Sequence, residues 1–240
     1  MKGRIPFPFP LEQEDIVRKR ASILANLLAC DQAFGRIPVQ GISAESLQYL
    51  LDAYNAVFLG GSLKHMQIQV TLSSRLTSCA GKFVFVRGAF GRIKQAEIRL
   101  SSDFLFRLVH GPFELNGLSV DTPQEAFLLV FEHELCHALE AMLYGNTGHS
   151  ERFLALANGL FGHTKTRHKL MTRRQEAAKD GLLVGSLVSF PYKGRELSGV
   201  VSYIGKTATV MVPSFNGEYR DKLGRRYDKY RVSLSHIKQN

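Results

Sequence analysis

The segment from Thr122 to Gly145 constrains the fold more than any other, because it is typical of one long helix with marked ends. Thr122-Pro-Gln-Glu125 fits a capping box with proline at the first helical position, and Gly145 is placed to end the helix. Residues 126–131 (AFLLVF) are apolar on every side, so other parts of the chain must surround this helix. We therefore expect it to lie at the centre of the core.

The same helix carries two histidines, His133 and His137, and Glu134 directly follows the first. Positions i and i+4 lie on one helix face, one turn apart, so both imidazoles can reach one ion. A catalytic zinc takes three protein ligands and keeps a fourth position for water. His149, beyond the stop at Gly145, is the natural third ligand, and Glu134 is placed as the general base of this motif.

Two alternatives remain open for this segment. Glu140 shares a helix face with His137 and could replace His149 as the third ligand, or could orient a histidine. We favour the orienting role, because His149 approaches from a separate element and completes a tetrahedron more easily. The second alternative is a core helix whose histidines are satisfied by hydrogen bonds, an arrangement that would be costly without a metal or partners. Cys136 is expected to be a small buried thiol.

Composition excludes several classes of protein. No apolar run approaches the roughly eighteen residues needed to span a bilayer, and prolines and acids interrupt the N-terminal segment where a signal peptide would need an apolar run. The three cysteines are widely spaced and odd in number, which argues against a disulfide framework or a cysteine-based zinc ribbon. We expect a cytoplasmic protein, associated with the nucleoid if it is bacterial.

The net charge of +10 is distributed unevenly. Residues 1–163 hold 15 Lys or Arg and 15 Asp or Glu, whereas residues 181–240 hold 10 and 4. This asymmetry predicts an anionic partner for the C-terminal third, and we expect DNA, single- or double-stranded. The candidate contact residues are cations near its tyrosines: Lys193, Arg195, Lys206, Arg220, Arg225, Arg226, Lys229 and Arg231.

Further helices and strands are expected on both sides of the central helix. Their predicted ranges are helices at 11–33, 44–59 and 150–160, and strands at 66–72, 82–90 and 96–101. After about residue 184, four or five short strands separated by glycines predict a small SH3-like β-barrel.

Several blocks of the chain resemble the SprT-like zinc metalloprotease family in their order. They are YNAVFLGGSL (54–63), SCAGKF (78–83), EIRLS (97–101), HELCH (133–137) and GHSERF (148–153). The resemblance implies a zincin-like α+β domain with one Zn²⁺ per chain. It also implies that His133, His137 and His149 are the metal ligands and that Glu134 is the catalytic acid/base.

The resemblance further implies hydrolysis of proteins that are bound or crosslinked to DNA. The alternative is a non-enzymatic nucleic-acid-binding or regulatory protein that keeps the zinc fold as a scaffold; Glu134 favours the enzyme, because a structural zinc needs no base. The expected division of the chain is an N-terminal arm and helix (1–40), a SprT-like metalloprotease domain (41–165), a basic helix or linker (166–182) and an SH3-like barrel of the Tudor/KOW type (183–240), in place of the zinc ribbon found in the family.

Overall fold

The computed structural model describes residues 5–63, 66–88, 93–167 and 170–239. They form two compact units, Met1–Leu170 and Met171–Asn240, each with its own hydrophobic core. Within the described residues, no helix combines the length and the apolar character that crossing a membrane requires. The division into four segments predicted from the sequence stays a prediction.

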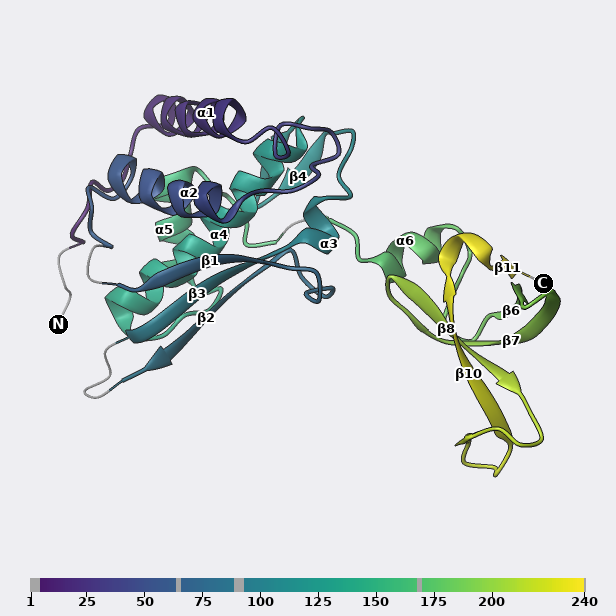
Figure 1. Cartoon of the computed structure of the whole chain (residues 1–240). Coiled ribbons are helices and arrows are strands. Elements are labelled where there is room, and N and C mark those ends of the chain that lie inside the picture. Colours follow the sequence, from purple (N-terminus) through teal and green to yellow (C-terminus); the bar gives the residue numbers. More distant parts are fainter. Residues whose placement is uncertain (1–4, 64–65, 89–92, 168–169, 240) are drawn as a thin grey trace. The chain divides into compact units, whose positions relative to one another are not determined.

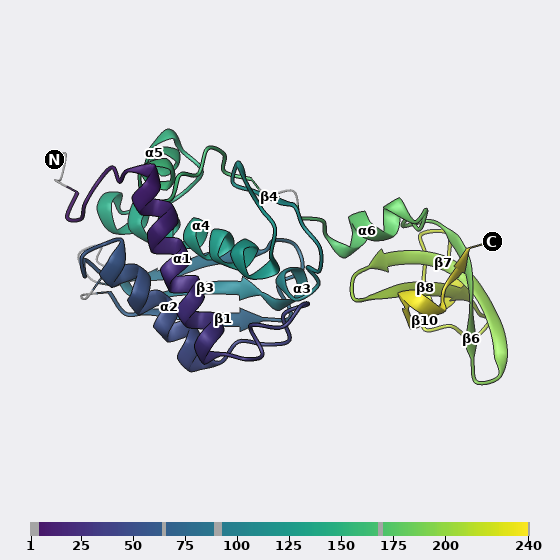
Figure 2. The ribbon, with the colours of Figure 1, turned by 90° about the horizontal axis from the view of Figure 1, so that it is seen from above.

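The first unit has a layer of three strands with helices over one face (Figure 1). Its main elements are α1 (Gln13–Cys30), α2 (Ala44–Val57), β1 (Ile68–Ser73), β2 (Gly81–Arg87), β3 (Ile93–Ser101), α4 (Pro123–Tyr144) and α5 (Glu151–Phe161). The strand order is β1-β3-β2, with β1 parallel and β2 antiparallel to the central β3. Viewed from above, α1 crosses α2 and α4 on the side away from the sheet (Figure 2). The helices and small mixed sheet agree with the α+β expectation.

Alternation of apolar and polar residues decides which face of the sheet is buried. Val70 and Phe83 both pair in register with Ile98, which is fully buried. Residues that pair directly across neighbouring strands point to the same face of a sheet, so these three side chains form one row toward the helices. The sheet thus presents one apolar face to the helical layer.

The central helix α4 has the ends that the sequence predicts. Thr122 Oγ1 accepts a hydrogen bond from the Glu125 backbone N–H, and Glu125 Oε2 accepts one from the Thr122 backbone N–H, so the capping box is confirmed. Gly145 ends the helix with a φ of 76°, a left-handed conformation that favours glycine. Residues 126–131 are all buried, as expected.

Three short elements of the first unit have no counterpart among the sequence predictions. They are α3 (Ser102–Leu105) and a hairpin of β4 (Phe113–Leu115) and β5 (Leu118–Val120). The hairpin turns at Asn116 and Gly117, whose positive φ values of 53° and 85° suit a tight turn. Strands of three residues are too short to leave a periodic signal in the sequence.

The second unit is an antiparallel sheet with an α-helix and a short 3₁₀ helix. Its elements are α6 (Arg173–Lys179), β6 (Leu187–Tyr192), β7 (Arg195–Ile204), β8 (Thr207–Pro213), β9 (Tyr219–Arg220), β10 (Arg226–Ser233), the 3₁₀ helix η2 (Leu234–His236) and β11 (Lys238–Gln239). The strand order is β11-β6-β7-β8-β10-β9. Ala177 of α6 and Leu182 are buried in the core of this unit, together with Val188 and Phe190 of β6. These pairings show a C-terminal sheet, and its closure into an SH3-like barrel stays a prediction.

Candidate metal centre

Three histidine side chains meet at one point beside α4. His133 and His137 project from successive turns of the helix, with ring centroids 4.9 Å apart. His149, from the loop between α4 and α5, places its Nε2 at 3.0 Å from Nε2 of His133. One ligand nitrogen from each of the three lies within 4.8 Å of the others. Two imidazole nitrogens that share one tetrahedral zinc lie roughly 3.3 Å apart, so the arrangement fits a divalent cation.

Glu140 fixes the loop that carries His149. Its Oε2 accepts a hydrogen bond of 2.8 Å from the Gly148 backbone N–H, and its Oε1 accepts one of 2.7 Å from Ser150 Oγ. Ser150 also caps α5 by accepting from the Phe153 backbone N–H. Both carboxylate oxygens of Glu140 are thus engaged in holding the loop. The orienting or structural role favoured from the sequence stays a prediction.

Environment keeps two of the three imidazoles neutral. Burial lowers the pKa of His137 to about 4, and the neighbouring His149 adds to the effect. Burial also lowers the pKa of His149, and the nearby Arg167 cation contributes. His137 Nδ1 and Thr147 Oγ1 share a hydrogen bond of 2.7 Å, so with Nδ1–H as the donor Nε2 keeps its lone pair for a cation. No sequence motif indicated Thr147.

Phe153 packs against all three imidazoles. Its ring centroid lies 4.9 Å from that of His133, 4.4 Å from that of His137 and 5.2 Å from that of His149. Phe153 is fully buried in the first turn of α5. The ring therefore restricts the rotamers of the histidines from the side of the core, which favours a preformed site.

Glu134 is buried beside the start of β2, with an exposed fraction of 5%. Burial raises the pKa of Glu134 to about 8, and a hydrogen bond from the Phe83 backbone N–H offsets only part of this rise. A Cβ on Gly81 would lie 2.6 Å from Glu134 Oε1, so the carboxylate can take this position because residue 81 is a glycine. Glycine in a strand often marks such a close approach.

The histidines and Glu134 open into a cleft of about 560 Å³. One wall is the start of β2, which is the last strand in the order β1-β3-β2. Another wall is the segment after α5. The residues lining the cleft besides these four are Leu76, Ser78, Cys79, Gly81, Lys82, Phe83, Asn116, Val130, Thr147, Thr166 and Arg167. The cleft is large enough for several residues of an extended peptide.

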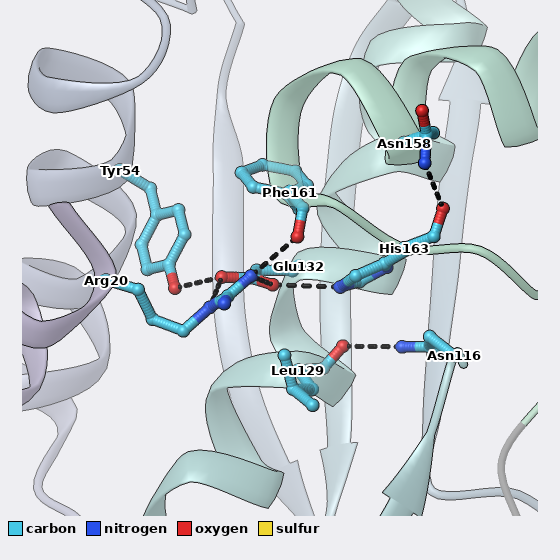
Figure 3. A network of polar contacts seen from close by, with 8 residues as sticks. All are labelled: Arg20, Tyr54, Asn116, Leu129, Glu132, Asn158, Phe161 and His163. Atoms are coloured by element: carbon cyan, nitrogen blue, oxygen red, sulfur yellow. Dashed lines mark hydrogen bonds and ion pairs between the residues drawn. The ribbon is translucent and has the colours of Figure 1, made fainter. Parts of the chain in front are cut away.

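Another face of α4 carries a third buried carboxylate, Glu132, which lies in a network of polar contacts (Figure 3). Its Oε1 accepts hydrogen bonds of 2.7 Å from Arg20 Nε and from Tyr54 Oη. Its Oε2 accepts one of 2.8 Å from Arg20 Nη2 and shares one of 2.9 Å with His163 Nε2. Arg20 Nη2 also donates to the Phe161 carbonyl oxygen. The network joins α1, α2 and the end of α5 to the helix that bears the histidines.

Partners rather than burial determine the charge of Glu132. Burial alone would raise the pKa of this carboxyl, but the Arg20 charge and the hydrogen bonds from His163 and Arg20 lower it to about 2. Glu132 is therefore ionised and paired in the folded state. The sequence placed Glu132 on another face than the histidines and gave no indication of its partners.

The eight predicted nucleic-acid contacts all lie on the second unit, and all are exposed. Lys193, Arg195 and Lys206 lie at the turns that flank β7, and the other five lie on β9, β10 and the segment between them. Two of those five, Lys229 and Arg231, share one face of β10 because they are two residues apart. Arg225 is paired within this unit, since its Nε donates to Asp221 Oδ2 at 2.7 Å.

The structure thus combines a helix-borne histidine pair, a third histidine and a mixed α/β layer. The model of the SprT-like family matches residues 47–173, more than half of the chain. The chain belongs to the SprT-like family, which confirms the resemblance. A search of curated proteins gives no match, and neither does a search of solved structures. The family match begins inside α2, so α1 and its Arg20 lie outside it.

Proposed function

We propose that the protein is a zinc-dependent endopeptidase with a zincin-like catalytic unit. The observation that carries the proposal is the convergence of three imidazole nitrogens within 4.8 Å, beside a buried glutamate, in a cleft. His133, His137 and His149 would hold one Zn²⁺, and Glu134 would be the acid/base. A purely structural zinc site closes its coordination with protein ligands, whereas three ligands and an open cleft suit catalysis.

Each residue has a defined part in peptide hydrolysis. Bound at the histidines, Zn²⁺ would polarise the scissile carbonyl and lower the pKa of the attacking water. In its ionised form, Glu134 accepts a proton from that water and returns it to the leaving amine, a transfer worth roughly 10²–10⁴-fold in rate. Glu140 and Thr147 hold His149 and His137 in place, and the Phe153 ring limits their movement.

The end of the sheet offers a means of binding an extended substrate. β2 pairs with β3 on one side, and its first residues, Gly81 to Phe83, line the cleft on the other. Unpaired backbone N–H and C=O groups at a sheet edge can pair with an added strand. Glu134 lies against the start of β2, since a Cβ at position 81 would touch its carboxylate. A substrate peptide placed along β2 would therefore pass Glu134 with its scissile bond.

We further propose that the C-terminal unit, closed as an SH3-like barrel, recruits DNA and so directs the peptidase to DNA-bound or DNA-crosslinked proteins. Lys229 and Arg231 project from the same side of β10, and the Lys229 ammonium lies 5.4 Å from the centre of the Tyr219 ring. Arg231 pairs with Thr209, which in turn pairs with Tyr203, an exposed residue. Cations beside exposed tyrosines suit phosphates and unpaired bases.

A cleavage assay with bound metal quantified tests both parts of the proposal. Wild type and Glu134→Gln would be compared on a DNA-binding protein substrate, without DNA and with single- or double-stranded DNA. We expect cleavage by wild type, stimulation by DNA, and retained zinc without cleavage in the variant. Equal activity in both proteins would contradict the role of Glu134, and a zinc-loaded wild type that cleaves nothing would favour the non-enzymatic alternative.

DNA recruitment is tested separately in the full-length protein. Lys229→Gln with Arg231→Gln should weaken DNA binding and reduce the slope of log affinity against log salt by about 1 per lost phosphate contact. Lys94→Gln, an exposed residue of β3 in the other unit, is the control for one such loss of charge. An unchanged salt slope in the double variant would refute the proposed contacts.

A further inference from the structure

Two cations face the cleft from separate walls, Lys82 from β2 and Arg167 from the segment after α5. Among the described residues that line the cleft, Glu134 carries the one carboxyl group, and it lies at the buried end beside Gly81. Both cations are exposed, and neither forms an ion pair within the described parts of the chain. The cleft therefore has an excess of positive charge beside the histidines.

Arg167 belongs to a segment that is fastened to α4. The Asn116 carbonyl oxygen accepts hydrogen bonds of 2.9 Å from the backbone N–H groups of Thr164 and Lys165, and the Asn116 backbone N–H donates to the Arg167 carbonyl oxygen at 3.0 Å. The Asn116 side-chain amide donates at 2.9 Å to the carbonyl oxygen of Leu129, one turn before His133 (Figure 3). This buried asparagine thus sets the position of the Arg167 backbone relative to the metal-binding helix.

The turn beside Asn116 leaves no room for a side chain at position 117. A Cβ on Gly117 would lie 2.0 Å from Thr164 Oγ1, and the φ of 85° at this glycine is one that other residues rarely adopt. Thr164 Oγ1 donates to the Gly117 carbonyl oxygen. The wall that carries Arg167 is therefore built by contacts to the hairpin and to α4.

From this arrangement we propose that Lys82 and Arg167 form a subsite that binds an acidic side chain of the peptide substrate close to the scissile bond. The inference rests on the proposed function, because it names the substrate class of the same cleft. A guanidinium binds a carboxylate through two parallel hydrogen bonds, and an ammonium adds a second charge without a fixed direction. Because both cations are exposed, the preference weakens as salt screens the charges.

Peptides that differ at a single position test this subsite. Full-length zinc-loaded protein would be given peptide series with Glu, Gln or Lys at each position flanking the cleaved bond, and kcat/KM would be measured. We expect Glu to be favoured over Gln by about tenfold at one position, and Lys to be the poorest. Lys82→Glu with Arg167→Glu should reverse the order, whereas Lys82→Arg with Arg167→Lys should keep it.

The control is Lys94→Glu, the same kind of charge reversal at one strand residue that does not line the cleft. It should leave the peptide preference within twofold of wild type. Cleavage of all peptides at equal rates would overturn the acidic subsite while the endopeptidase proposal stands.

Failure to cleave any peptide would instead refute the proposed function. The affinity of the protein for the peptides then tests whether the acidic subsite exists. The affinity of the Glu and Lys peptides for the Glu134→Gln protein should still differ by about tenfold, and the difference should vanish in the charge-reversed background. Equal affinities would overturn the subsite. If a short oligonucleotide, rather than the acidic peptide, loses affinity in the Lys82→Glu and Arg167→Glu protein, the cations bind nucleic acid and the peptide assignment is wrong.

Discussion

Glu132 and Glu134 lie two residues apart on α4, both are buried, and their pKa values shift in opposite directions. The pKa of Glu132 is about 2, because Arg20, His163 and Tyr54 stabilise the carboxylate despite its burial. The pKa of Glu134 is about 8, because burial is opposed by a single backbone donor, that of Phe83. Glu132 is thus an ionised, paired carboxylate in the core, whereas Glu134 is a carboxyl group beside the cleft that can exchange a proton. The difference between the two pKa values comes from their partners.

The largest expected effect comes from making the same substitution at both positions. Glu132→Gln should lower the free energy of unfolding by about 3–5 kcal/mol, because it leaves the Arg20 charge buried without its partner. Glu134→Gln should cause no such loss, because it removes a carboxyl group that burial opposes. Urea unfolding of metal-free protein, followed by helical circular dichroism, measures both. Equal losses would show that the set of partners does not distinguish the two residues.

The next largest effect is expected from filling the space beside Glu134. Gly81→Ala places a Cβ against Oε1 of this carboxylate and should reduce kcat by about 100-fold, since a displacement of about 1 Å can cost that much. Zinc content should stay at the wild-type value, because no histidine contact changes. Gly41→Ala is the matched control, as its Cβ would meet the Ala33 Cβ at an ordinary 3.7 Å. Full activity in Gly81→Ala would remove Glu134 from the proposed chemistry.

A smaller effect should follow from loosening a histidine without touching either glutamate. Thr147→Val removes the hydroxyl that shares a hydrogen bond with His137 Nδ1, and it should weaken zinc affinity by about 10-fold or somewhat more. Competition with a chelator measures the affinity, and unfolding of the metal-free protein should be nearly unchanged. A large loss of stability with intact zinc affinity would assign Thr147 to the fold instead of the site.

The sequence predicted the central helix well because its signals are local. The Thr122 cap, the apolar run 126–131 and the Gly145 stop act within one or two turns, and all were confirmed. The histidine spacing depends on the same helical period, and the structure brings His133, His137 and His149 together as expected. Their assignment as zinc ligands is tested by the metal measurement below.

The partners of Glu132 could not be predicted from the sequence, because they come from distant parts of the chain. Arg20 precedes Glu132 by 112 residues, and Tyr54 precedes it by 78. Neither residue has a local pattern that distinguishes it from other surface arginines or core tyrosines. The same holds for Asn116, whose role depends on the path of the segment that begins at Thr164.

Crystallography of the zinc-loaded protein, with anomalous scattering recorded on both sides of the zinc absorption edge, tests the central claim most directly. The account predicts one zinc peak per chain, bound by Nε2 of His133, His137 and His149, with Glu140 still hydrogen-bonded to Gly148 and Ser150. A zinc ion bound by Glu140 in place of His149, or the absence of any zinc at these three rings, would contradict it.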